Sequence, residues 1–337
     1  MSLVRSILTL SWLCLGWFLL VAALVWAFGA LWFDFPLAGW RHPVAMLFIA
    51  GATAALILVR PRKRAKAGVA VALLLVLAWW LSLRPSNHRN WQPDVAEAAW
   101  AEVNGDTVTL HNVRNCHYRT ETDYTPRWET RAVHLSQLTG IHIAICYWGS
   151  PWMAHPILSF QFADGPPLAM SIETRKQVGE EYSAIGGFYR QYELIYLAAD
   201  ERDVLGVRTN FRKGEDIYLY RSTVTPAAAR ERFMEYVHTI NAMRDHPRWY
   251  NALTTNCTTA IRSQHAAAER APFDWRMLAN GKMDEMFFEK GLLVTDGLTF
   301  AELKRRALIN PAAQAAGASP DFSRLIRLDK PGFGGPR

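Results

Sequence analysis

The chain has 337 residues, half of them hydrophobic, and a formal net charge of +7. Five basic residues stand in one short segment between apolar runs, and without them the net charge would be +2: Arg60, Arg62, Lys63, Arg64 and Lys66. A nucleic-acid-binding surface needs basic residues spread over a folded face, so this clustering argues against a nucleic-acid partner. The length suits one ordinary domain together with a membrane anchor.

Three apolar runs near the N-terminus are predicted to form transmembrane helices, at about residues 6–33, 43–59 and 69–83. The first run has no charged residue and exceeds the roughly 20 apolar residues that a helix needs to cross a bilayer. It is also too long for the core of a signal peptide. The other two runs are near the lower length limit. A hydrophobic hairpin in a soluble protein is the alternative interpretation.

The charges flanking these runs predict the orientation of the chain. Segment 60–68 holds five basic and no acidic residues, and short positive loops stay in the cytoplasm. The N-terminus, with Arg5, then lies inside, and the third helix exits. We therefore predict a multi-pass protein of the bacterial inner membrane, in contact with the phospholipid bilayer. Residues 1–84 would be its transmembrane anchor and residues 85–337 its periplasmic domain.

The outer part of the chain is predicted to be α+β, with a largely antiparallel sheet followed by helices. Strand-like runs stand at residues 106–113, 114–120, 140–149, 192–198 and 215–222, and residues 157–175 read as a hairpin joined around Asp164–Pro167. Apolar residues at helical spacing predict a helix over residues 227–247 and another over 251–268. We expect the Ala-, Gly- and Pro-rich end after Asn310 to be loosely held. The charged run Asp200-Glu201-Arg202-Asp203 is expected to be a salt-bridged turn.

Cys257 is the candidate nucleophile. It follows the polar residues of NALTTN, of which the last is Asn256, at the expected start of a helix. Unpaired backbone N–H groups there favour a thiolate and can hold an oxyanion. Asn256 is therefore a candidate substrate-binding residue. A buried structural cysteine at position 257 is the open alternative.

His155 and Glu173 are the candidate partners of this thiol. His155 begins an apolar strand and can accept a proton at neutral pH. Glu173 stands on the second strand of the hairpin, where it would orient the imidazole if the hairpin register put both residues on one face. The alternative is that Glu173 pairs with Arg175 or another arginine. The histidine spacings match no metal-site pattern, so we predict neither a metal nor a cofactor.

Trp148 and Trp152 belong to an aromatic-rich run that would line an apolar acyl-binding groove. Ordinary core packing is the alternative for both. Cys14 lies in an apolar helix and is expected to act as a small hydrophobe. The sequence leaves open whether Cys116 and Cys146 form a disulfide.

Four motifs, in chain order, resemble the Lnb N-terminal periplasmic domain family over roughly residues 85–330: AHPILSFQFADG, SIETRKQVGEEYS, FYRQYELIYLAADERDVLGVRTNFRKGEDIYLY and HPRWYNALTTNCTT. The family takes its name from lipoprotein N-acyltransferases, which move an acyl chain from a phospholipid to the N-terminal cysteine of a lipoprotein. The resemblance implies a papain-like fold in which the histidine precedes the cysteine, as in circularly permuted members of that superfamily. His155 and Cys257 fall on the histidine and cysteine of this pattern. In the acyltransferases the membrane helices follow the outer domain, whereas here they precede it, which leaves the acceptor open.

These inferences predict a membrane-tethered periplasmic thiol acyltransferase that uses a Cys-His pair and a thioester intermediate. It would resemble the lipoprotein N-acyltransferases, with a lipoprotein or another envelope molecule as the substrate partner. One alternative is a membrane-anchored cysteine peptidase or amidase acting on the cell envelope. The other is a non-catalytic envelope protein.

Overall fold

The computed structural model describes residues 2–255, 274–277 and 280–334, and the chain divides into two compact units. The first, here called the helical unit, comprises Met1–Pro85, Glu181–Tyr192 and Trp249–Ala252. The second, here called the sheet unit, comprises Ser86–Glu180, Glu193–Arg248 and Leu253–Arg337.

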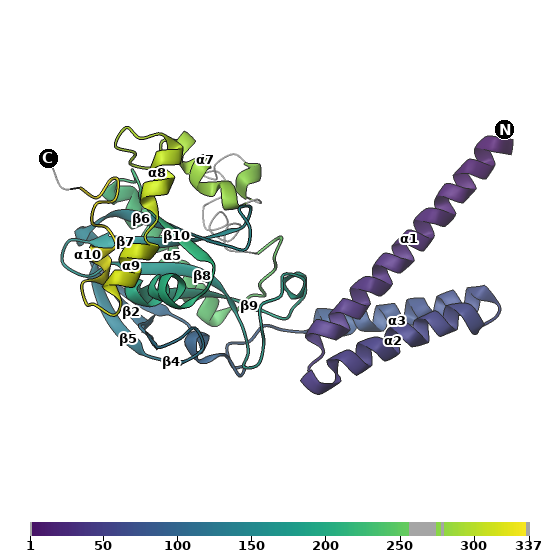
Figure 1. The fold of residues 1–337 in the computed structure, drawn as a ribbon. Coiled ribbons are helices and arrows are strands. Elements are labelled where there is room, and N and C mark those ends of the chain that lie inside the picture. The colour runs from purple at the N-terminus through teal and green to yellow at the C-terminus, as the bar shows by residue number, and fades with distance from the viewer. Residues whose placement is uncertain (1, 256–273, 278–279, 335–337) are drawn as a thin grey trace. The chain divides into compact units, whose positions relative to one another are not determined.

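The helical unit contains three helices that are long and apolar enough to cross a membrane, as predicted. They are α1 (Ser2–Asp34), α2 (Arg41–Leu58) and α3 (Arg62–Ser82), with a short 3-10 turn η1 (Ala38–Trp40) before α2 (Figure 1). Pro61 caps α3, and a proline disfavours helical backbone in the residue before it, so α2 ends at Leu58. Most of the basic segment expected to be a loop therefore forms the first turns of α3.

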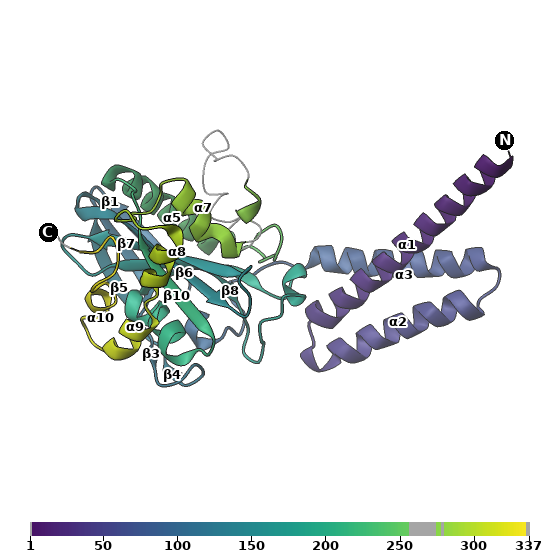
Figure 2. The same cartoon turned by 45° about the horizontal axis from the view of Figure 1, so that its top comes forward.

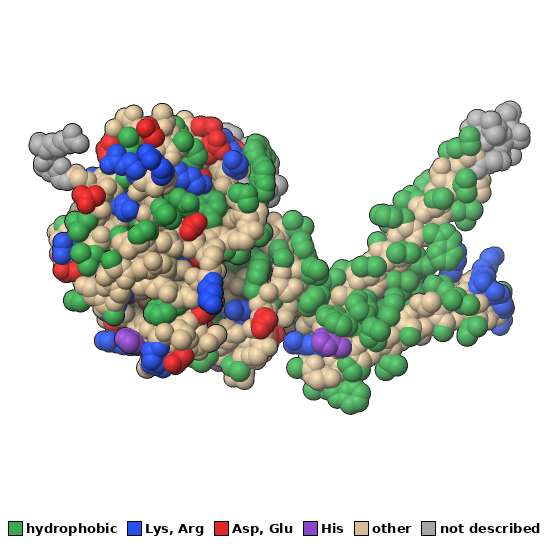
Figure 3. Space-filling view, viewed as in Figure 1, with side chains coloured by type: hydrophobic (Ala, Val, Ile, Leu, Met, Phe, Trp, Pro, Cys, Tyr) green, Lys and Arg blue, Asp and Glu red, His purple; other side chains and the backbone are tan. Residues whose placement is uncertain are grey.

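The surface of these helices is apolar, and several small side chains are buried where the helices pack together. Leu24, Ala52 and Val69 meet in a common cluster, and other apolar side chains buried on the helices include Ala27, Ala30, Leu31, Ala45 and Ala65. Small residues allow helix backbones to approach closely. Large side chains such as Trp12, Leu47 and Leu74 are exposed, and Figure 3 shows hydrophobic groups over the helices. Such a surface associates with membrane lipid.

The sheet unit is built on an eight-stranded sheet with the order β1-β2-β9-β8-β7-β6-β10, and β5 pairs with β2 off this path. The strands are β1 (Trp100–Asn104), β2 (Thr107–Arg114), β5 (Trp128–His134), β6 (Leu138–Trp148), β7 (Ala154–Phe162), β8 (Leu168–Arg175), β9 (Glu193–Asp200) and β10 (Glu215–Arg221). Their pairings are antiparallel except β2 with β9, which is parallel. A separate pair is formed by β3 (His117–Tyr118) and β4 (Tyr124–Thr125).

Helices cover both faces of this sheet (Figure 2). One face is covered by α5 (Pro226–Asp245), α7 (Met283–Glu289) and α8 (Phe300–Ala307). On this side the Phe160 ring meets those of Phe233 and Tyr236, at centroid distances of 5.1 and 5.9 Å. The other face is covered by α4 (Glu201–Val204), the π-helical turn η5 (Val207–Phe211), α9 (Asn310–Ala316) and α10 (Phe322–Leu325). The predicted α+β class with three N-terminal helices is thus confirmed.

Short 3-10 turns connect several of these elements. They are η2 (Pro93–Val95), η3 (Leu135–Gln137), η4 (Gly186–Phe188), η7 (Trp275–Met277) and η8 (Asn280–Lys282). Of these turns, η4 belongs to the helical unit.

The C-terminal segment is packed into the core, which corrects the expectation that it is loosely held. Ile309, Ala313, Phe322 and Ile326 are buried against the sheet face that also holds Ile157. The few large apolar residues of this segment are spaced so that α9 and α10 each bury one side. Burial of such side chains contributes about 1.5–3 kcal/mol each, which is enough to hold an Ala- and Gly-rich segment in place.

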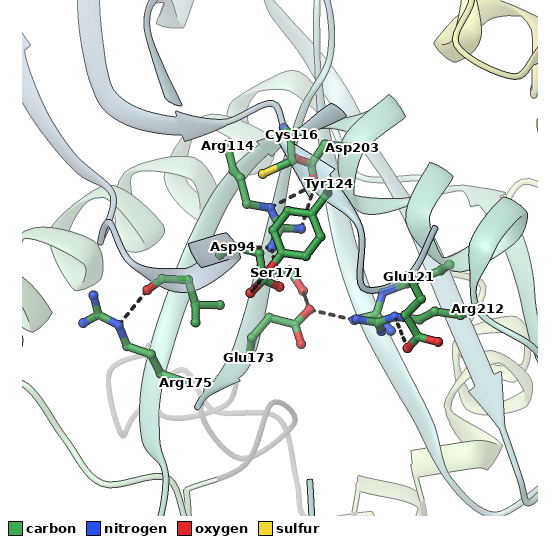
Figure 4. A network of polar contacts seen from close by, with 12 residues as sticks. Asp94, Arg114, Cys116, Glu121, Tyr124, Ser171, Glu173, Arg175, Asp203 and Arg212 are labelled. Atoms are coloured by element: carbon green, nitrogen blue, oxygen red, sulfur yellow. Dashed lines mark hydrogen bonds and ion pairs between the residues drawn. The ribbon is translucent and has the colours of Figure 1, made fainter. Parts of the chain in front are cut away.

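The charged run at residues 200–203 forms buried ion pairs, in agreement with the predicted salt-bridged turn. Asp200 caps α4 by accepting a hydrogen bond from the backbone N–H of Arg202. Glu201 pairs with Arg327 at 2.5 Å. Asp203 pairs with Arg114 at 2.7 Å, and Figure 4 shows this contact beside Cys116. The turn therefore ties β9 to β2 and to the C-terminal segment.

Candidate active site

The hairpin of β7 and β8 brings His155 and Glu173 to facing positions on one side of the sheet. The two strands pair antiparallel with Ile157 opposite Ser171. Side chains alternate faces along a strand, so residues two positions from this pair project from the same face as the pair itself. The sequence leaves the register of this hairpin open. In the structure the register places the imidazole of His155 and the carboxylate of Glu173 together.

The three polar groups of the hairpin form a closed set of contacts. Nε2 of His155 lies 2.7 Å from Oγ of Ser171 and 3.1 Å from Oε1 of Glu173. The Ser171 hydroxyl donates to the same Oε1 atom at 2.6 Å, and Figure 4 shows these two side chains in contact. His155 and Ser171 are buried. Their positions are thus fixed by the sheet as well as by hydrogen bonds.

Arg208 supplies a positive charge to the same carboxylate. Its Nη2 donates to Oε1 of Glu173 at 2.8 Å, and its Nη1 donates to Oε2 of Glu215 at 3.1 Å. Arg208 comes from η5, and single π-helical turns of this kind are frequent at functional sites. The guanidinium therefore links the hairpin to β10.

The surroundings of Glu173 keep its carboxylate ionised. Burial by itself would raise its pKa, but attraction to His155 and Arg208, with hydrogen bonds from His155 and Ser171, outweighs this effect. The net result is that the pKa of Glu173 lies well below its usual range. At neutral pH the group is an anion that only accepts hydrogen bonds.

This arrangement assigns the tautomer of His155. Ser171 donates its hydroxyl proton to Glu173, so its oxygen is an acceptor toward the imidazole. Nε2 of His155 must then hold a proton, and in the neutral ring the lone pair is on Nδ1. Nδ1 is consequently the atom of this histidine that can take a proton from a nucleophile.

Two of the described thiols are poorly suited to be that nucleophile. Cys146 stands directly opposite His155 in the pairing of β6 and β7, but it is fully buried and burial raises its pKa to about 12. Burial and the nearby Asp203 carboxylate raise the pKa of Cys116 to about 11. Both are free cysteines, which answers the question of a disulfide between them. A neutral, buried thiol is a weak nucleophile.

Cys257 and Asn256, the candidate nucleophile and its neighbour, lie outside the described residues. Of the helix expected over residues 251–268, the described part, 251–255, is a turn at 252–254 between two bridge residues. The roles predicted for Cys257, His155 and Glu173 therefore stay predictions. The structure describes one part of the candidate site, namely the His155 imidazole with the Ser171 hydroxyl and the Glu173 carboxylate that contact it.

Trp148 and Trp152 occupy different surroundings. Half-buried Trp148 ends β6 and lines a cleft of about 400 Å³ with Asp216, Lys282, Asp284, Glu285 and Lys304 among its other walls. Trp152 is 54% exposed and is not among the described residues that line this cleft. Among the described residues, the walls of this cleft are charged as well as aromatic.

Two of the residues that line this cleft form an ion pair next to an aromatic ring. Nζ of Lys304 lies 2.8 Å from Oδ2 of buried Asp284 and 4.0 Å from the ring centre of Tyr147. The Tyr147 hydroxyl accepts a hydrogen bond from the same ammonium at 2.9 Å. Within the described ranges, no three His, Cys, Asp or Glu residues are grouped so that they could hold a metal ion.

Sequence reasoning missed Ser171 and Arg208. Ser171 precedes Glu173 by two positions on the same strand, so its place on the same face was available from the alternation of side chains. Arg208 is 35 residues away from Glu173 in the chain and reaches it from a π-helical turn. No local pattern marks that contact.

A comparison with known protein families finds a match over the region that contains this site. Residues 124–281 match the family model of the Lnb N-terminal periplasmic domain, which confirms the resemblance over a shorter range than the motifs suggest. No curated protein and no solved structure matches the chain. His155, Glu173 and Cys257 all lie within the matched residues.

Proposed function

We propose that this chain is a thiol acyltransferase. The premise is that it is a membrane protein with an Lnb N-terminal periplasmic domain. Cys257 would be the nucleophile, His155 the general base, and Glu173 the residue that orients the imidazole. The domain would be a permuted papain-like fold in which the histidine precedes the cysteine. Its membrane would be the bacterial inner membrane, and residues 85–337 would form the periplasmic part.

One observation supports this proposal above the others, namely the hydrogen-bond chain from Nε2 of His155 through Ser171 to Glu173. An ionised carboxylate behind an imidazole holds one tautomer and stabilises the imidazolium that forms during proton transfer. Arg208 keeps the carboxylate charged in its buried position. A histidine with only a packing role would need no such arrangement.

The proposed reaction proceeds through a thioester. Nδ1 of His155 takes the thiol proton, and Sγ of Cys257 attacks the carbonyl carbon of a phospholipid ester. A C–S bond forms, the ester C–O bond breaks, and the imidazolium gives its proton to the departing lysophospholipid oxygen. An amine then attacks the thioester carbonyl, the C–S bond breaks, and the amine proton returns to sulfur through His155. The N-terminal amine of a lipoprotein is the acceptor that the family suggests.

The test uses the full-length protein in vesicles whose phospholipids hold an alkyne at the end of each acyl chain. We expect the wild-type protein to acquire the alkyne through a bond that neutral hydroxylamine cleaves, because that reagent cleaves thioesters but leaves amides intact. Cys257→Ala should not acquire it, because it has no acceptor sulfur. His155→Ala should acquire it far more slowly, by about 100-fold or more, because general-base catalysis is lost.

Cys146→Ala is the matched control, since it removes the described thiol that stands opposite His155 without touching the proposed nucleophile. It should acquire the alkyne as the wild type does. Normal labelling of Cys257→Ala would refute the assignment of the nucleophile. Wild-type protein that remains unlabelled with every phospholipid, although its Cys257 reacts with thiol reagents, would refute the phospholipid donor.

A second candidate is a membrane-anchored cysteine peptidase or amidase that acts on the cell envelope. The charged walls of the cleft at Trp148 favour it, because peptide and glycan substrates need polar partners. Incubation with peptidoglycan fragments distinguishes the two candidates. Release of a new amine that requires Cys257, without any phospholipid acyl capture, would support the hydrolase. Neither reaction would be expected of a non-catalytic envelope protein.

A further inference from the structure

The segment Glu181–Tyr192, here called the interfacial loop, belongs to the helical unit although it lies far from the three helices in sequence. Arg190 joins it to them. Its backbone N–H donates to Oδ2 of Asp34 at 3.0 Å, and its Nη1 donates to the carbonyl oxygens of Trp80 at 2.5 Å and Leu83 at 2.9 Å. The guanidinium also lies 4.0 Å from the centre of the Trp80 ring. Next to it, Tyr189 stacks on Phe33 with centroids 5.3 Å apart.

These contacts are made at one end of the helices. Asp34 is the last residue of α1, and it accepts a hydrogen bond from Nε1 of Trp80 in the last turn of α3 at 2.7 Å. Aromatic pairs gather at the same end: Trp26 with Trp80, Trp32 with His42, and Phe35 with Trp79. Aromatic rings of this kind mark the boundary between the hydrocarbon and the headgroups of a bilayer. The part of the interfacial loop around Arg190 would therefore lie at the level of the membrane surface.

At that level the interfacial loop exposes large apolar side chains. Ile185 is 62% exposed, Tyr182 is 48% exposed and Phe188 is 45% exposed. Ile185 and Phe188 are three positions apart across the 3-10 turn η4, so their side chains project from the same side of this turn. Apolar groups that are exposed beside the ends of membrane-spanning helices are continuous with the lipid-facing surface of those helices.

The interfacial loop also holds the chain that leads to Cys257. The backbone N–H of Tyr250 donates to the carbonyl of Tyr192 at 3.0 Å, and that of Ala252 donates to the carbonyl of Gly187 at 2.8 Å. A Cβ on Gly187 would lie 3.3 Å from both Tyr250 and Ala252, so glycine permits this close approach. The segment Trp249–Ala252 is thereby fixed to the interfacial loop, five residues before the candidate thiol.

We propose that the interfacial loop inserts Ile185 and Phe188 into the outer leaflet and binds phospholipid acyl chains there. It thereby holds the segment Trp249–Ala252 at the membrane surface. Lipid is the occupant because the loop is packed on the ends of membrane-spanning helices, at the level of their aromatic boundary. This goes beyond the acyltransferase proposal, because the insertion would occur whether or not Cys257 acts on lipid.

Photo-crosslinking tests the insertion directly. The photoreactive amino acid p-benzoylphenylalanine replaces Phe188 in the full-length protein, in nanodiscs of phospholipids with alkyne-tagged acyl chains. Illumination should attach tagged lipid at position 188 in several times higher yield than at Leu328, which is 50% exposed in the sheet unit. The variant Ile185→p-benzoylphenylalanine repeats the measurement if position 188 impairs folding.

Equal lipid adducts at positions 188, 185 and 328 would overturn the proposal. So would crosslinks from positions 185 and 188 to another protein in native membranes without any lipid adduct. The same measurement in Cys257→Ala separates this proposal from the catalytic one, because lipid adducts at position 188 should persist when acyl capture is abolished. A loss of acyl capture alone therefore leaves the insertion supported.

Discussion

Oε1 of Glu173 lies 3.1 Å from Nε2 of His155, and the two residues face each other across neighbouring strands. The same oxygen accepts hydrogen bonds from Ser171 and Arg208. One carboxylate atom thus sets the tautomer of the imidazole, and the guanidinium keeps that atom charged. This relationship makes the site sensitive to the charge of residue 173 and much less sensitive to the intervening hydroxyl.

Glu173→Gln should reduce acyl capture by about 100-fold, because the imidazolium loses its anionic partner at the step in which it forms. Loss of a charge-assisted hydrogen bond to Arg208 should also lower the free energy of unfolding by about 2 kcal/mol. Capture rates across a pH series and unfolding in detergent measure the two effects. Glu173→Asp should recover part of the rate because the charge is retained.

Glu215→Gln is the matched control for stability, since it removes the other carboxylate on Arg208. It should lose a similar free energy of unfolding and keep its acyl capture. If Glu215→Gln and Glu173→Gln lost the rate equally, Glu173 would be a structural partner of Arg208 and not a positioning residue for His155.

Ser171→Ala should have a small effect on the rate and lower the free energy of unfolding by about 1 kcal/mol. Nε2 of His155 is already within 3.1 Å of Glu173, so the two groups can bond directly once the hydroxyl is removed. Acyl capture and thermal unfolding of the purified variant measure this. Ser171 is buried, and its hydroxyl touches the imidazole. Abolished capture in Ser171→Ala, with normal capture in Cys257→Ala, would identify the serine as the nucleophile.

Cys146→Ala should leave the rate unchanged and lower the free energy of unfolding by about 1 kcal/mol, because it removes one buried atom from the core. In the native wild-type protein, mass spectrometry after brief alkylation should find Cys146 and Cys116 unmodified, since burial keeps both thiols neutral. Modification of both should appear after unfolding. Rapid alkylation of Cys146 in the native protein would contradict the raised pKa and would reopen its candidacy as a nucleophile.

The elements that could be predicted from the sequence are those set by local pattern. Long charge-free runs identify the helices that are long and apolar enough to cross a membrane, and alternation identifies strands such as β6 and β10. The helix α3 begins before the apolar run predicts, because the basic residues that precede this run also form helix. The packing of the C-terminal segment cannot be predicted from its composition, which is dominated by small residues, because it depends on Ile309 and Phe322.

The candidate site divides in the same way. The hairpin made a contact between His155 and Glu173 plausible, but the choice between two registers depends on the pairing of whole strands. The position of Arg208 depends on how η5 packs on the sheet, which is a tertiary property without a local signature. Trp148 and Trp152 are close in sequence, but Trp148 ends β6 and lines the cleft, whereas Trp152 follows the strand and is exposed.

Glu201→Gln should remove part of the acid sensitivity of the protein. Burial alone would raise the pKa of Glu201, but attraction and hydrogen bonding to Arg327 with a bond from Ser159 lower it from 4.5 to about 2. A lowered pKa in the folded state means that the stabilisation is present above pH 4.5 and is lost as the pH falls toward 2. The contribution is about 3 kcal/mol, from 1.36 kcal/mol for each pKa unit.

Unfolding of the full-length protein in detergent, followed over a pH series, measures this contribution. His142 adjoins the same guanidinium, with Nδ1 3.1 Å from Nε of Arg327, and burial together with that charge lowers its pKa from 6.5 to about 3. In the unfolded state His142 binds a proton as the pH falls through about 6.5, whereas in the folded state it does so only near pH 3, so the protein loses stability below pH 6.5. His142→Asn should remove this loss of stability, and Glu201→Gln should remove the loss below pH 4.5. Glu231→Gln, at an exposed position on α5, controls for the removal of one carboxylate. The Glu201→Gln protein could be less stable at neutral pH and still lose as much stability between pH 4.5 and 3 as the Glu231→Gln control. That result would show that the carboxylate of Glu201 does not titrate in this window.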